Sequence, residues 1–284
     1  MFCEICFKAV LKIALKGWRP YPRIRIEFFV SSTSMLLTRA SSLCYDSLLA
    51  LMYPHACAVC GGSVESRELG AACANCWRHT QVFSGTEVLC WKCGQPSLGA
   101  VPTEKRETVR CRRCDEDAFT AARACGVYEG ALRASILQLK HEPHLSRKLI
   151  ELLVCKQQQS PLNKATRIIP VPLHSERERD RGFNQATLIG RALSRAASLP
   201  LDEVSLVRVK NIKRHRAGMD AKGRRDTVAN AFRVTHPALI AGERVLLVDD
   251  VFTTGATVSS CASVLLDAGA AEVFVLTIAR PVRY

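Results

Sequence analysis

Two acids and three threonines stand close together in residues 245–257, where their types and spacing suit a sugar phosphate. Four apolar residues of strand-forming type run directly into Asp249 and Asp250. After Val251 and Phe252 come five residues that are here called the threonine loop: Thr253, Thr254, Gly255, Ala256 and Thr257. A helical pattern follows over 258–268. Because the first amides of a helix and the positive end of its dipole attract anions, the loop is predicted to hold a phosphate.

The carboxylates of Asp249 and Asp250 disfavour a phosphate beside them, so they must face sugar hydroxyls or a metal ion. Together with the threonine loop they predict a ribose 5-phosphate pocket at the carboxyl end of a strand. An ordinary buried strand capped by Asp, with threonines in a turn, is the structural alternative. Neither G-x-x-x-x-G-K-[ST] nor G-x-G-x-x-G after a strand occurs in the chain.

Eight of the 14 cysteines form four C-x-x-C pairs between residues 57 and 114. The pairs are Cys57 with Cys60, Cys73 with Cys76, Cys90 with Cys93, and Cys111 with Cys114. Two such pairs complete a tetrahedral zinc site, and joining neighbouring pairs leaves spacers of 12 and 17 residues. Joining the first pair with the third and the second with the fourth is also compatible with the spacing. Four thiolates leave no open coordination position, so we expect two structural zinc ions.

Basic and aromatic residues lie among these pairs, and they suit single-stranded nucleic acid. They are Trp77, Trp91, Lys92, Arg110, Arg112 and Arg113. The chain carries a formal net charge of +14, from 40 Lys and Arg against 26 Asp and Glu. This excess favours polyanionic partners or phosphate-rich ligands, and charge alone does not separate the two. Side chains that only cover the ribbon are the structural alternative.

The 284 residues are predicted to divide into three parts. Residues 1–42 form an extension of no clear period, either disordered or untranslated, with Met35 as a second plausible start. A double zinc ribbon spans 43–117, and an α/β domain spans 118–284. No apolar run approaches the roughly 18 residues of a membrane span, and lysines interrupt the first residues. We therefore expect a cytoplasmic protein.

Strand and helix patterns alternate after residue 118, which predicts a parallel sheet covered on both faces. The expected strands are 124–128, 167–172, 204–209, 244–251 and 272–279, and the expected helices are 131–139, 145–154, 183–197 and 258–268. Residues 173–182 are expected to form a loop. The basic segment 210–225 has little apolar content, so we expect a mobile loop that closes over phosphates, or a solvated charge run.

Several motifs occur together in the order seen in the ComF/GntX family, which this chain resembles over roughly residues 43–284. Beside the cysteine pairs and residues 245–257, they are Tyr128-Glu-Gly, Leu139-Lys140, Ile169-Pro-Val-Pro172 and Arg181-Gly-Phe-Asn-Gln185. The resemblance implies a double zinc ribbon joined to a domain of the phosphoribosyltransferase fold that uses phosphoribosyl pyrophosphate (PRPP). It also implies a link to natural transformation, with single-stranded DNA and the DNA-uptake machinery as partners.

Carried over by position, the resemblance assigns Asp249 and Asp250 to the ribose hydroxyls and residues 253–257 to the 5-phosphate. Arg177 and Arg181, always cationic and bidentate, would bind the pyrophosphate, and magnesium would bind with PRPP. In the basic segment, family positions of Thr, Gln, Arg and Asn are occupied here by Lys213, Arg216, Arg224 and Thr227. Thr253 stands where purine-salvage relatives carry an Asp, which argues against simple hypoxanthine or guanine salvage.

Three functions are compatible with these motifs. The first is an enzyme that passes ribose 5-phosphate from PRPP to a nitrogen nucleophile, which the sequence does not identify. The second is a module that binds single-stranded nucleic acid and keeps the phosphoribosyl pocket as a sensor or relic. The third is a zinc-stabilised adaptor, which leaves residues 245–257 unexplained.

Overall fold

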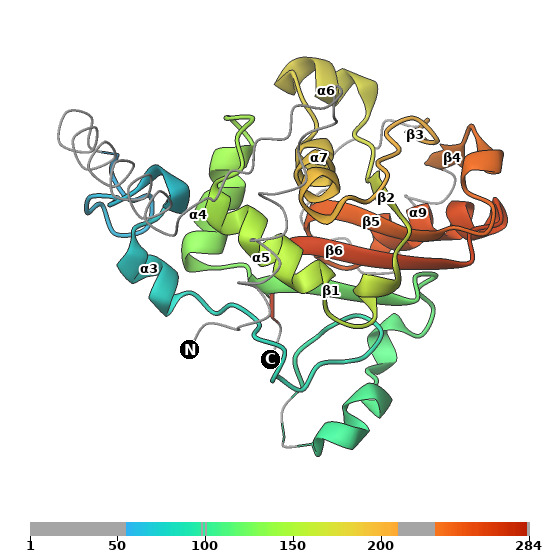
Figure 1. The fold of residues 1–284 in the computed structure, drawn as a ribbon, viewed down its shortest axis with the longest axis horizontal. Helices are drawn as coiled ribbons and strands as arrows, with labels where there is room; N and C mark the ends of the chain where they lie inside the picture. Colours follow the sequence, from blue (N-terminus) through green and yellow to red (C-terminus); the bar gives the residue numbers. More distant parts are fainter. Residues whose placement is uncertain (1–54, 98, 100, 210–230, 283–284) are drawn as a thin grey trace, which may run out of the picture.

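A four-stranded parallel sheet organises the computed structural model, which describes residues 55–97, 99, 101–209 and 231–282 (Figure 1). Its strands stand in the order β1, β6, β5, β2. Their bounds are β1 Ala121–Val127, β2 Arg167–Pro170, β5 Arg244–Val251 and β6 Glu272–Arg280. The strands predicted around 124–128, 167–172, 244–251 and 272–279 are therefore present and parallel.

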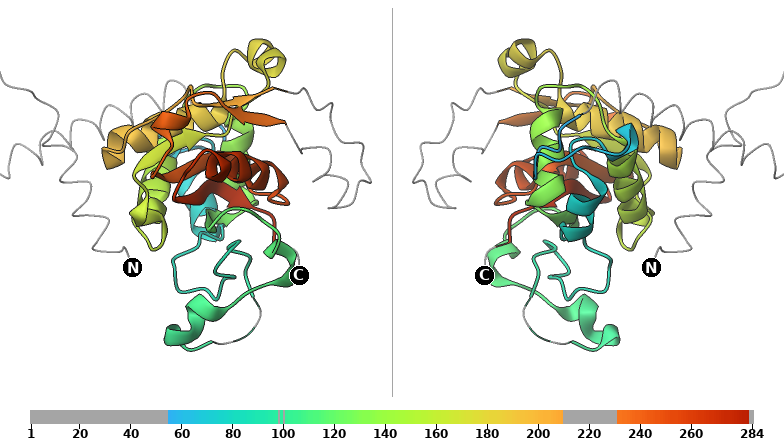
Figure 2. Two further views of the ribbon diagram at one scale, coloured as in Figure 1. Left: turned by 90° about the vertical axis from the view of Figure 1, so that its right-hand side faces the viewer. Right: turned by 90° about the vertical axis from the view of Figure 1, so that its left-hand side faces the viewer.

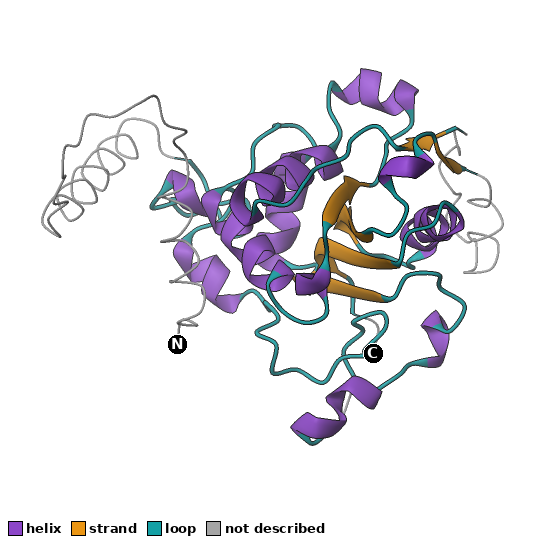
Figure 3. Ribbon diagram, turned by 45° about the vertical axis from the view of Figure 1, so that its right-hand side comes forward, coloured by secondary structure: helices purple, strands orange, loops and turns teal. Residues whose placement is uncertain are grey.

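Both faces of the sheet are buried, because neighbouring residues of each strand point to opposite faces. Leu246 and Val248 pack toward α4, α5 and α7, whereas Val245 and Leu247 pack toward α9. The bounds of these helices are α4 Gly130–Leu139, α5 Arg147–Gln157, α7 Gln185–Ala197 and α9 Ala256–Asp267. Figure 3 shows helices on both sides of the strands, which confirms the predicted α/β architecture.

The segment predicted as a strand at 204–209 does not join the parallel sheet, and this expectation was wrong. It contributes β3, Leu206–Arg208, which pairs antiparallel with β4, Phe232–Val234. Leu206 and Phe232 bury their side chains over α9, in the same apolar cluster as Val245 and Leu247. The apolar alternation was real, but its partner is only three residues long and has little pattern of its own.

The segment predicted as a loop at 173–182 contains a helix, α6, Ser175–Arg181. The amide of Glu176 donates to the ring of His174 at its start, and Gly182 ends the helix in the left-handed conformation with φ 77°. Its sequence, SERERDR, has no apolar face, so a search for apolar periodicity cannot find it. The basic segment 210–225 and the extension 1–42 lie outside the described residues.

The two zinc ribbons lie at different places around the sheet. The first, with helix α3, Ala74–His79, packs beside α4, and the second projects below the sheet in Figures 1 and 2. The shorter 3-10 helices are η1 Arg67–Leu69, η2 Thr103–Thr108, η3 Arg112–Cys114, η4 Leu162–Lys164 and η5 Pro237–Leu239. The segment between the ribbons pairs with the outer side of β1, through a bridge of Val82 with Gly126. Phe83 N donates to Cys125 O at 2.8 Å there.

No helix in the described ranges is long and apolar enough to cross a bilayer.

Candidate functional site

The threonine loop follows β5 at the carboxyl edge of the sheet. Asp249 lies within β5 and is paired with Thr277 of β6, and Asp250 follows it in β5. Both acids therefore lie near the carboxyl ends of these two adjacent parallel strands. Phe252 N still donates to Ala279 O at 3.0 Å, and the chain then leaves the sheet. Gly255 has φ 83°, a left-handed conformation that favours glycine, and it turns the chain into α9. The predicted strand, loop and helix are thus present in the predicted order.

Four of the five amides of the threonine loop have no hydrogen-bond partner among the described residues. Among the described residues, no acceptor faces the N–H groups of Thr253, Thr254, Gly255 or Thr257. Ala256 N lies 3.5 Å from Thr254 Oγ1, inside the same loop. These donors converge at the N-terminus of a 12-residue helix, where the dipole adds positive potential. At these four amides the loop can therefore accept an anion without breaking a hydrogen bond.

The two acids are half-buried, and they are electrostatically coupled. Asp249 Oδ1 accepts from the Asp250 amide at 2.8 Å. Burial, followed by the neighbouring charge of Asp250, raises the pKa of Asp249 well above its usual range. Arg208 of β3 acts in the opposite direction, toward the ionised form. Sequence reasoning missed this arginine, because the hairpin that carries it was assigned to the main sheet.

The predicted pyrophosphate ligands Arg177 and Arg181 lie on α6, in the segment after β2. Because β2 pairs with β5, this segment starts from the same edge of the sheet as the threonine loop. Arg181 Nη1 donates to Gln185 Oε1 at 3.2 Å. Arg177 lies one turn earlier on the same helix. Asn184 caps α7 through Ala186 N and donates to Val171 O at 3.0 Å. Asn184 therefore caps α7 and fastens its start to the segment after β2.

The eight cysteines form two tetrads from neighbouring pairs, which settles the pairing left open by the spacing. The first tetrad is Cys57, Cys60, Cys73 and Cys76, and the second is Cys90, Cys93, Cys111 and Cys114. The recorded sulfur–sulfur distances run from 3.5 to 3.8 Å. A tetrahedron with Zn–S bonds of about 2.3 Å has edges of about 3.8 Å. The tetrads therefore fit structural zinc.

Nearby backbone amides favour the thiolate form of two of these cysteines. Cys73 N points at Cys57 Sγ and Cys111 N at Cys90 Sγ, each at 3.3 Å. Although burial opposes it, backbone donors led by Cys73 lower the pKa of Cys57 to about 6. The Cys93 thiol and, against the effect of burial, nearby amides lower the pKa of Cys90 to about 4. Metal ligation requires thiolates, so these two shifts favour binding. In the other direction, burial and neighbouring thiols raise the pKa values of Cys76 and Cys114, and the Cys90 thiol together with burial raises the pKa of Cys93.

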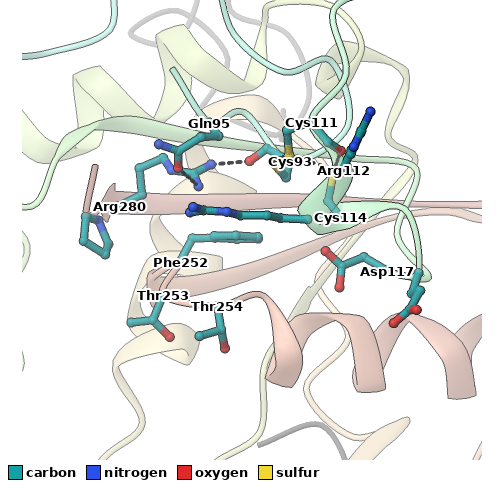
Figure 4. Close-up of a pocket in the computed structure, with 13 residues that line it drawn as sticks. Cys93, Gln95, Cys111, Arg112, Cys114, Asp117, Phe252, Thr253, Thr254 and Arg280 are labelled. Carbon is teal, nitrogen blue, oxygen red and sulfur yellow. Dashed lines mark hydrogen bonds between the residues drawn. The ribbon is translucent and has the colours of Figure 1, made fainter. Parts of the chain in front are cut away.

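A cavity of about 450 Å³ lies between the second tetrad and the threonine loop (Figure 4). Its lining comprises Cys93, Gln95, Cys111, Arg112, Arg113, Cys114, Glu116, Asp117, Phe252, Thr253, Thr254, Arg280 and Pro281. Spacing gave no signal that the second ribbon and the loop would meet, because they are far apart in the chain. The structure brings Thr253 and Thr254 together with three zinc-binding cysteines.

Arg280, at the end of β6, joins these two regions. Its Nη1 donates to Cys93 O, and its Nη2 donates to Gln95 Oε1 at 2.6 Å. Its guanidinium lies over the Phe252 ring, 5.0 Å from the centroid. Burial lowers the pKa of Arg280 from its ordinary value. A side chain that looked like the polar end of a strand is therefore a buried link between tetrad and loop.

The aromatic residues predicted to stack on nucleic acid are engaged elsewhere. Trp77 is buried, and its Nε1 donates to Leu69 O at 2.9 Å. Trp91 lies under the guanidinium of Arg123, 5.0 Å from the ring centroid, and Arg123 Nη1 donates to Trp91 O. Covering the ribbon was the alternative interpretation of these tryptophans, and it is correct for both. Arg110, Arg112 and Arg113 are exposed.

Comparison with known proteins shows two domains and a family for this chain. The chain matches the Double zinc ribbon domain over residues 48–115 and the Phosphoribosyl transferase domain over residues 183–283. It is 32% identical over 216 residues to the DNA utilization protein YhgH of Shigella flexneri, covering 73% of this chain and 89% of that protein. It is 41% identical over 117 residues to Competence protein F of Haemophilus influenzae, covering 40% and 49%.

A similar solved structure is glutamine PRPP amidotransferase from B. subtilis, complexed with ADP and GMP. It is 19% identical, covers 47% of this chain and 28% of that chain, and superposes with a TM-score of 0.32. The double zinc ribbon, the phosphoribosyl transferase domain and the coverage of the YhgH relative together identify the family. The chain belongs to the ComF/GntX family.

Proposed function

We propose that the protein binds PRPP or another phosphorylated ribose, with magnesium, at Asp249, Asp250 and residues 253–257. The observation that carries this proposal is the set of four threonine-loop amides without a hydrogen-bond partner among the described residues, shortly after two acids at a strand end. A phosphate at these four amides would replace no hydrogen bond within the described part of the chain. The adjacent acids would accept from sugar hydroxyls, which a phosphate cannot offer.

Each side chain then has a distinct role in the proposal. Asp249 and Asp250 hold the ribose 2- and 3-hydroxyls, and the threonine loop holds the 5-phosphate. Arg177 and Arg181 approach the pyrophosphate from α6, the helix after β2. Magnesium, bound with PRPP, would supply charge neutralisation to the pyrophosphate.

The proposed reaction is transfer of ribose 5-phosphate from PRPP to a nitrogen nucleophile. Relatives named for DNA utilization and competence support a place for it in DNA uptake, on the cytoplasmic side. Pyrophosphate would be the leaving group of this transfer. The basic segment 210–225, predicted from the sequence to close over phosphates, lies outside the described residues.

Calorimetry of the full chain with PRPP, with and without magnesium, tests the proposal. We expect magnesium-dependent binding in the unmodified protein and at least a roughly hundredfold weaker affinity in the double variant Asp249→Asn, Asp250→Asn, since buried charged hydrogen bonds contribute about 1.5–3 kcal/mol each. Asp267→Asn is the matched control, because Asp267 is exposed at the far end of α9.

Zinc content is measured on every variant to show that the ribbons are intact. Absence of PRPP binding by an unmodified protein that carries two zinc ions would contradict the proposal. Equal affinity in the double variant and in Asp267→Asn would contradict the role of the acids.

A second proposed function is binding of single-stranded DNA by the second ribbon, where Arg110, Arg112 and Arg113 are exposed. Because both tryptophans are engaged within the protein, the contacts would be made with phosphates. Fluorescence anisotropy with a labelled oligonucleotide should show steep salt dependence, and the Arg110→Ala variant should reduce the slope by about one. A salt-independent affinity would exclude phosphate contacts.

We also propose the division of the chain at residues 42 and 117. In the described part, cysteines of each tetrad share an apolar cluster with the α/β domain. The ribbons are therefore packed on the domain, and experiments on function need the full chain.

A further inference from the structure

We infer that Cys60, in the first zinc ribbon, is a site of oxidation by hydroperoxides, and that its oxidation releases the first zinc ion while the second stays bound. Of the eight cysteines in the two tetrads, Cys60 alone is exposed. The inference goes beyond the proposed function, because it needs no phosphoribosyl ligand. It rests on a comparison of the two ribbons, which offer zinc the same four thiolates but cover them differently.

The turn that begins the first ribbon runs from Cys57 to Gly62. Gly61 N donates to Cys57 O at 2.9 Å, and Cys57 N donates to Gly62 O at 2.6 Å. Gly61 has φ 74°, a left-handed conformation that favours glycine. This turn carries Cys60, directly before its two glycines, at the surface of the protein.

The turn that begins the second ribbon has the same backbone hydrogen bonds. Gly94 N donates to Cys90 O and Cys90 N donates to Gln95 O, each at 2.8 Å. Gly94 has φ 70°, close to the value in the first turn. Cys93 therefore corresponds to Cys60, yet Cys93 is buried, with 5% of its surface exposed. The backbone of the turn does not explain this contrast.

One side chain accounts for the difference. The first ribbon has Gly62 where the second has Gln95. Gln95 Oε1 accepts from Arg280 Nη2 at 2.6 Å, and Arg280 also donates to Cys93 O. At Gly62 there is no side chain, and a Cβ atom placed there would lie 3.5 Å from Cys60 Sγ. Cys60 is therefore open on the side where Gln95 and Arg280 cover Cys93.

The sulfur of Cys60 also lacks an amide donor. Cys73 N points at Cys57 Sγ at 3.3 Å, and Cys76 N points at Cys73 Sγ at 3.5 Å. Within the described ranges, no N–H group donates to Cys60 Sγ. Because a hydrogen bond to a thiolate stabilises its charge and reduces its nucleophilicity, Cys60 is the most reactive of these three ligands.

The proposed oxidation has two steps. The Cys60 thiolate attacks one oxygen of hydrogen peroxide, the O–O bond breaks, hydroxide leaves, and the sulfur becomes a sulfenic acid. The thiolate of Cys73, whose sulfur lies 3.8 Å from that of Cys60, then attacks the sulfenic sulfur. An S–S bond forms and a second hydroxide leaves, so two thiolates are oxidised and one peroxide is reduced. The tetrad then keeps too few thiolates to hold zinc.

Loss of this ion is expected to loosen the first ribbon from the helices beside it. Cys73 and Trp77 of the ribbon lie in the same apolar cluster as Leu132 of α4 and Leu149 of α5. Zinc fixes the start of α3, the helix that carries Trp77. The second ribbon lies at another place around the sheet, so its zinc is expected to stay bound (Figure 1).

Treatment of the full, zinc-loaded chain with hydrogen peroxide tests the inference. A chromogenic chelator should record release of one zinc ion well before the other. Peptide mapping at that stage should find a disulfide that contains Cys60 and intact thiols at the second tetrad. A reductant supplied together with zinc should restore two bound ions, because a disulfide is reversible whereas a sulfinic acid is not.

The variant Gly62→Leu covers Cys60 without removing a zinc ligand. It should release the first ion at least roughly threefold more slowly, since oxidation follows the exposure of the thiolate. The matched control Ala58→Leu adds the same side chain at an exposed position of the same turn, and it should react like the unmodified protein.

Four results would overturn the inference. They are retention of both ions under excess peroxide, release of both ions at one rate, first release from the second tetrad, and an unchanged rate in a zinc-loaded Gly62→Leu variant. None of these results bears on PRPP binding, which calorimetry measures separately.

Discussion

The two zinc tetrads have the same ligands and similar geometry, but their surroundings differ. The first packs with α4 and α5, where Thr80 Oγ1 accepts from Ala131 N at 2.8 Å and Arg147 pairs with Glu68 at 2.8 Å. The second contacts the sheet through the half-buried Arg123 and the buried Arg280, and it borders the threonine loop. Two zinc sites with the same four ligands can therefore have different surroundings, one among helices and one beside a cavity at the proposed phosphate loop.

The difference lies in what each ribbon attaches to. The first is attached to helices, away from the carboxyl edge of β5. The second is attached to the ends of strands, where parallel sheets place their ligands. Loss of zinc from either tetrad should destabilise the protein, but loss from the second should also weaken ligand binding.

Removing one zinc ligand from each tetrad should give the largest effects. Cys60→Ser and Cys93→Ser should each lower bound zinc from two ions to one per chain and cost several kcal/mol, because structural zinc contributes directly to folding. Only Cys93→Ser should also weaken ribose 5-phosphate binding, by about tenfold or more. Zinc release measured with a chromogenic chelator, together with calorimetry, checks both. Equal loss of ligand affinity in the two variants would remove the distinction.

Arg280→Met should produce the next largest effect, because it leaves the buried Cys93 carbonyl and Gln95 without their donors. We expect a loss of about 2–4 kcal/mol in the free energy of unfolding. We also expect roughly 10–100-fold weaker zinc binding at the second tetrad, as for other partners of metal ligands. Arg280→Lys keeps the positive charge but replaces the two-pronged guanidinium with a single ammonium group. Its stability and its zinc affinity should therefore lie between those of the unmodified protein and Arg280→Met. Full stability of Arg280→Met in chemical denaturation would show that the link is not needed.

Asp249→Asn should stabilise the ligand-free protein above neutral pH, by on the order of 1 kcal/mol. The pKa of Asp249 is raised by folding, so the folded state favours the protonated form, and stability is lost as pH rises through the folded pKa. Near pH 4, close to the unfolded pKa of about 3.9, the variant and the unmodified protein should converge. Urea denaturation between pH 4 and 9 measures the difference. A difference in the free energy of unfolding that does not change with pH would exclude the ionisation of Asp249 as its cause. The control variant Asp267→Asn should show no such dependence on pH.

Arg147→Ala should have the smallest effect, although it removes the ion pair between the first ribbon and α5. The Arg147 and Glu68 side chains are 52% and 56% exposed, and exposed pairs contribute about 0–1 kcal/mol. Zinc content and ligand affinity should be unchanged. A large loss of zinc from the first tetrad would mean that this ribbon depends on surface charge rather than on its apolar contacts.

Local patterns carried most of the fold prediction. Neighbouring cysteine pairs, the strand ending in Asp249 and Asp250, and the helix after the threonine loop depend on residues close in sequence, and the structure contains all of them. Helix α6 was missed because it is charged on every side, and the β3–β4 hairpin because β4 shows no alternation long enough to recognise. The roles assigned to Arg177, Arg181 and the threonine loop stay predictions.

The arrangement of the site required contacts that no local pattern encodes. Arg280 is the last residue of the buried strand β6, where a cation usually faces solvent, yet it is buried against Cys93. Trp77 was predicted to stack on nucleic acid, but it is buried in the apolar cluster that also contains Leu246 and Val248. Both outcomes depend on where the ribbons dock, which is decided by shape and buried surface rather than by spacing. The candidate positions Lys213, Arg216, Arg224 and Thr227 lie outside the described residues.

The pairing of Val82 with β1 has a practical consequence. An outermost strand offers a row of unsatisfied amides and carbonyls, to which a second molecule can add its own strand. Here the chain between the ribbons occupies part of that row, through Phe83 N to Cys125 O and Val127 N to Gln81 O. A fragment that begins after the ribbons should therefore self-associate into aggregates, and its inactivity would say nothing about catalysis.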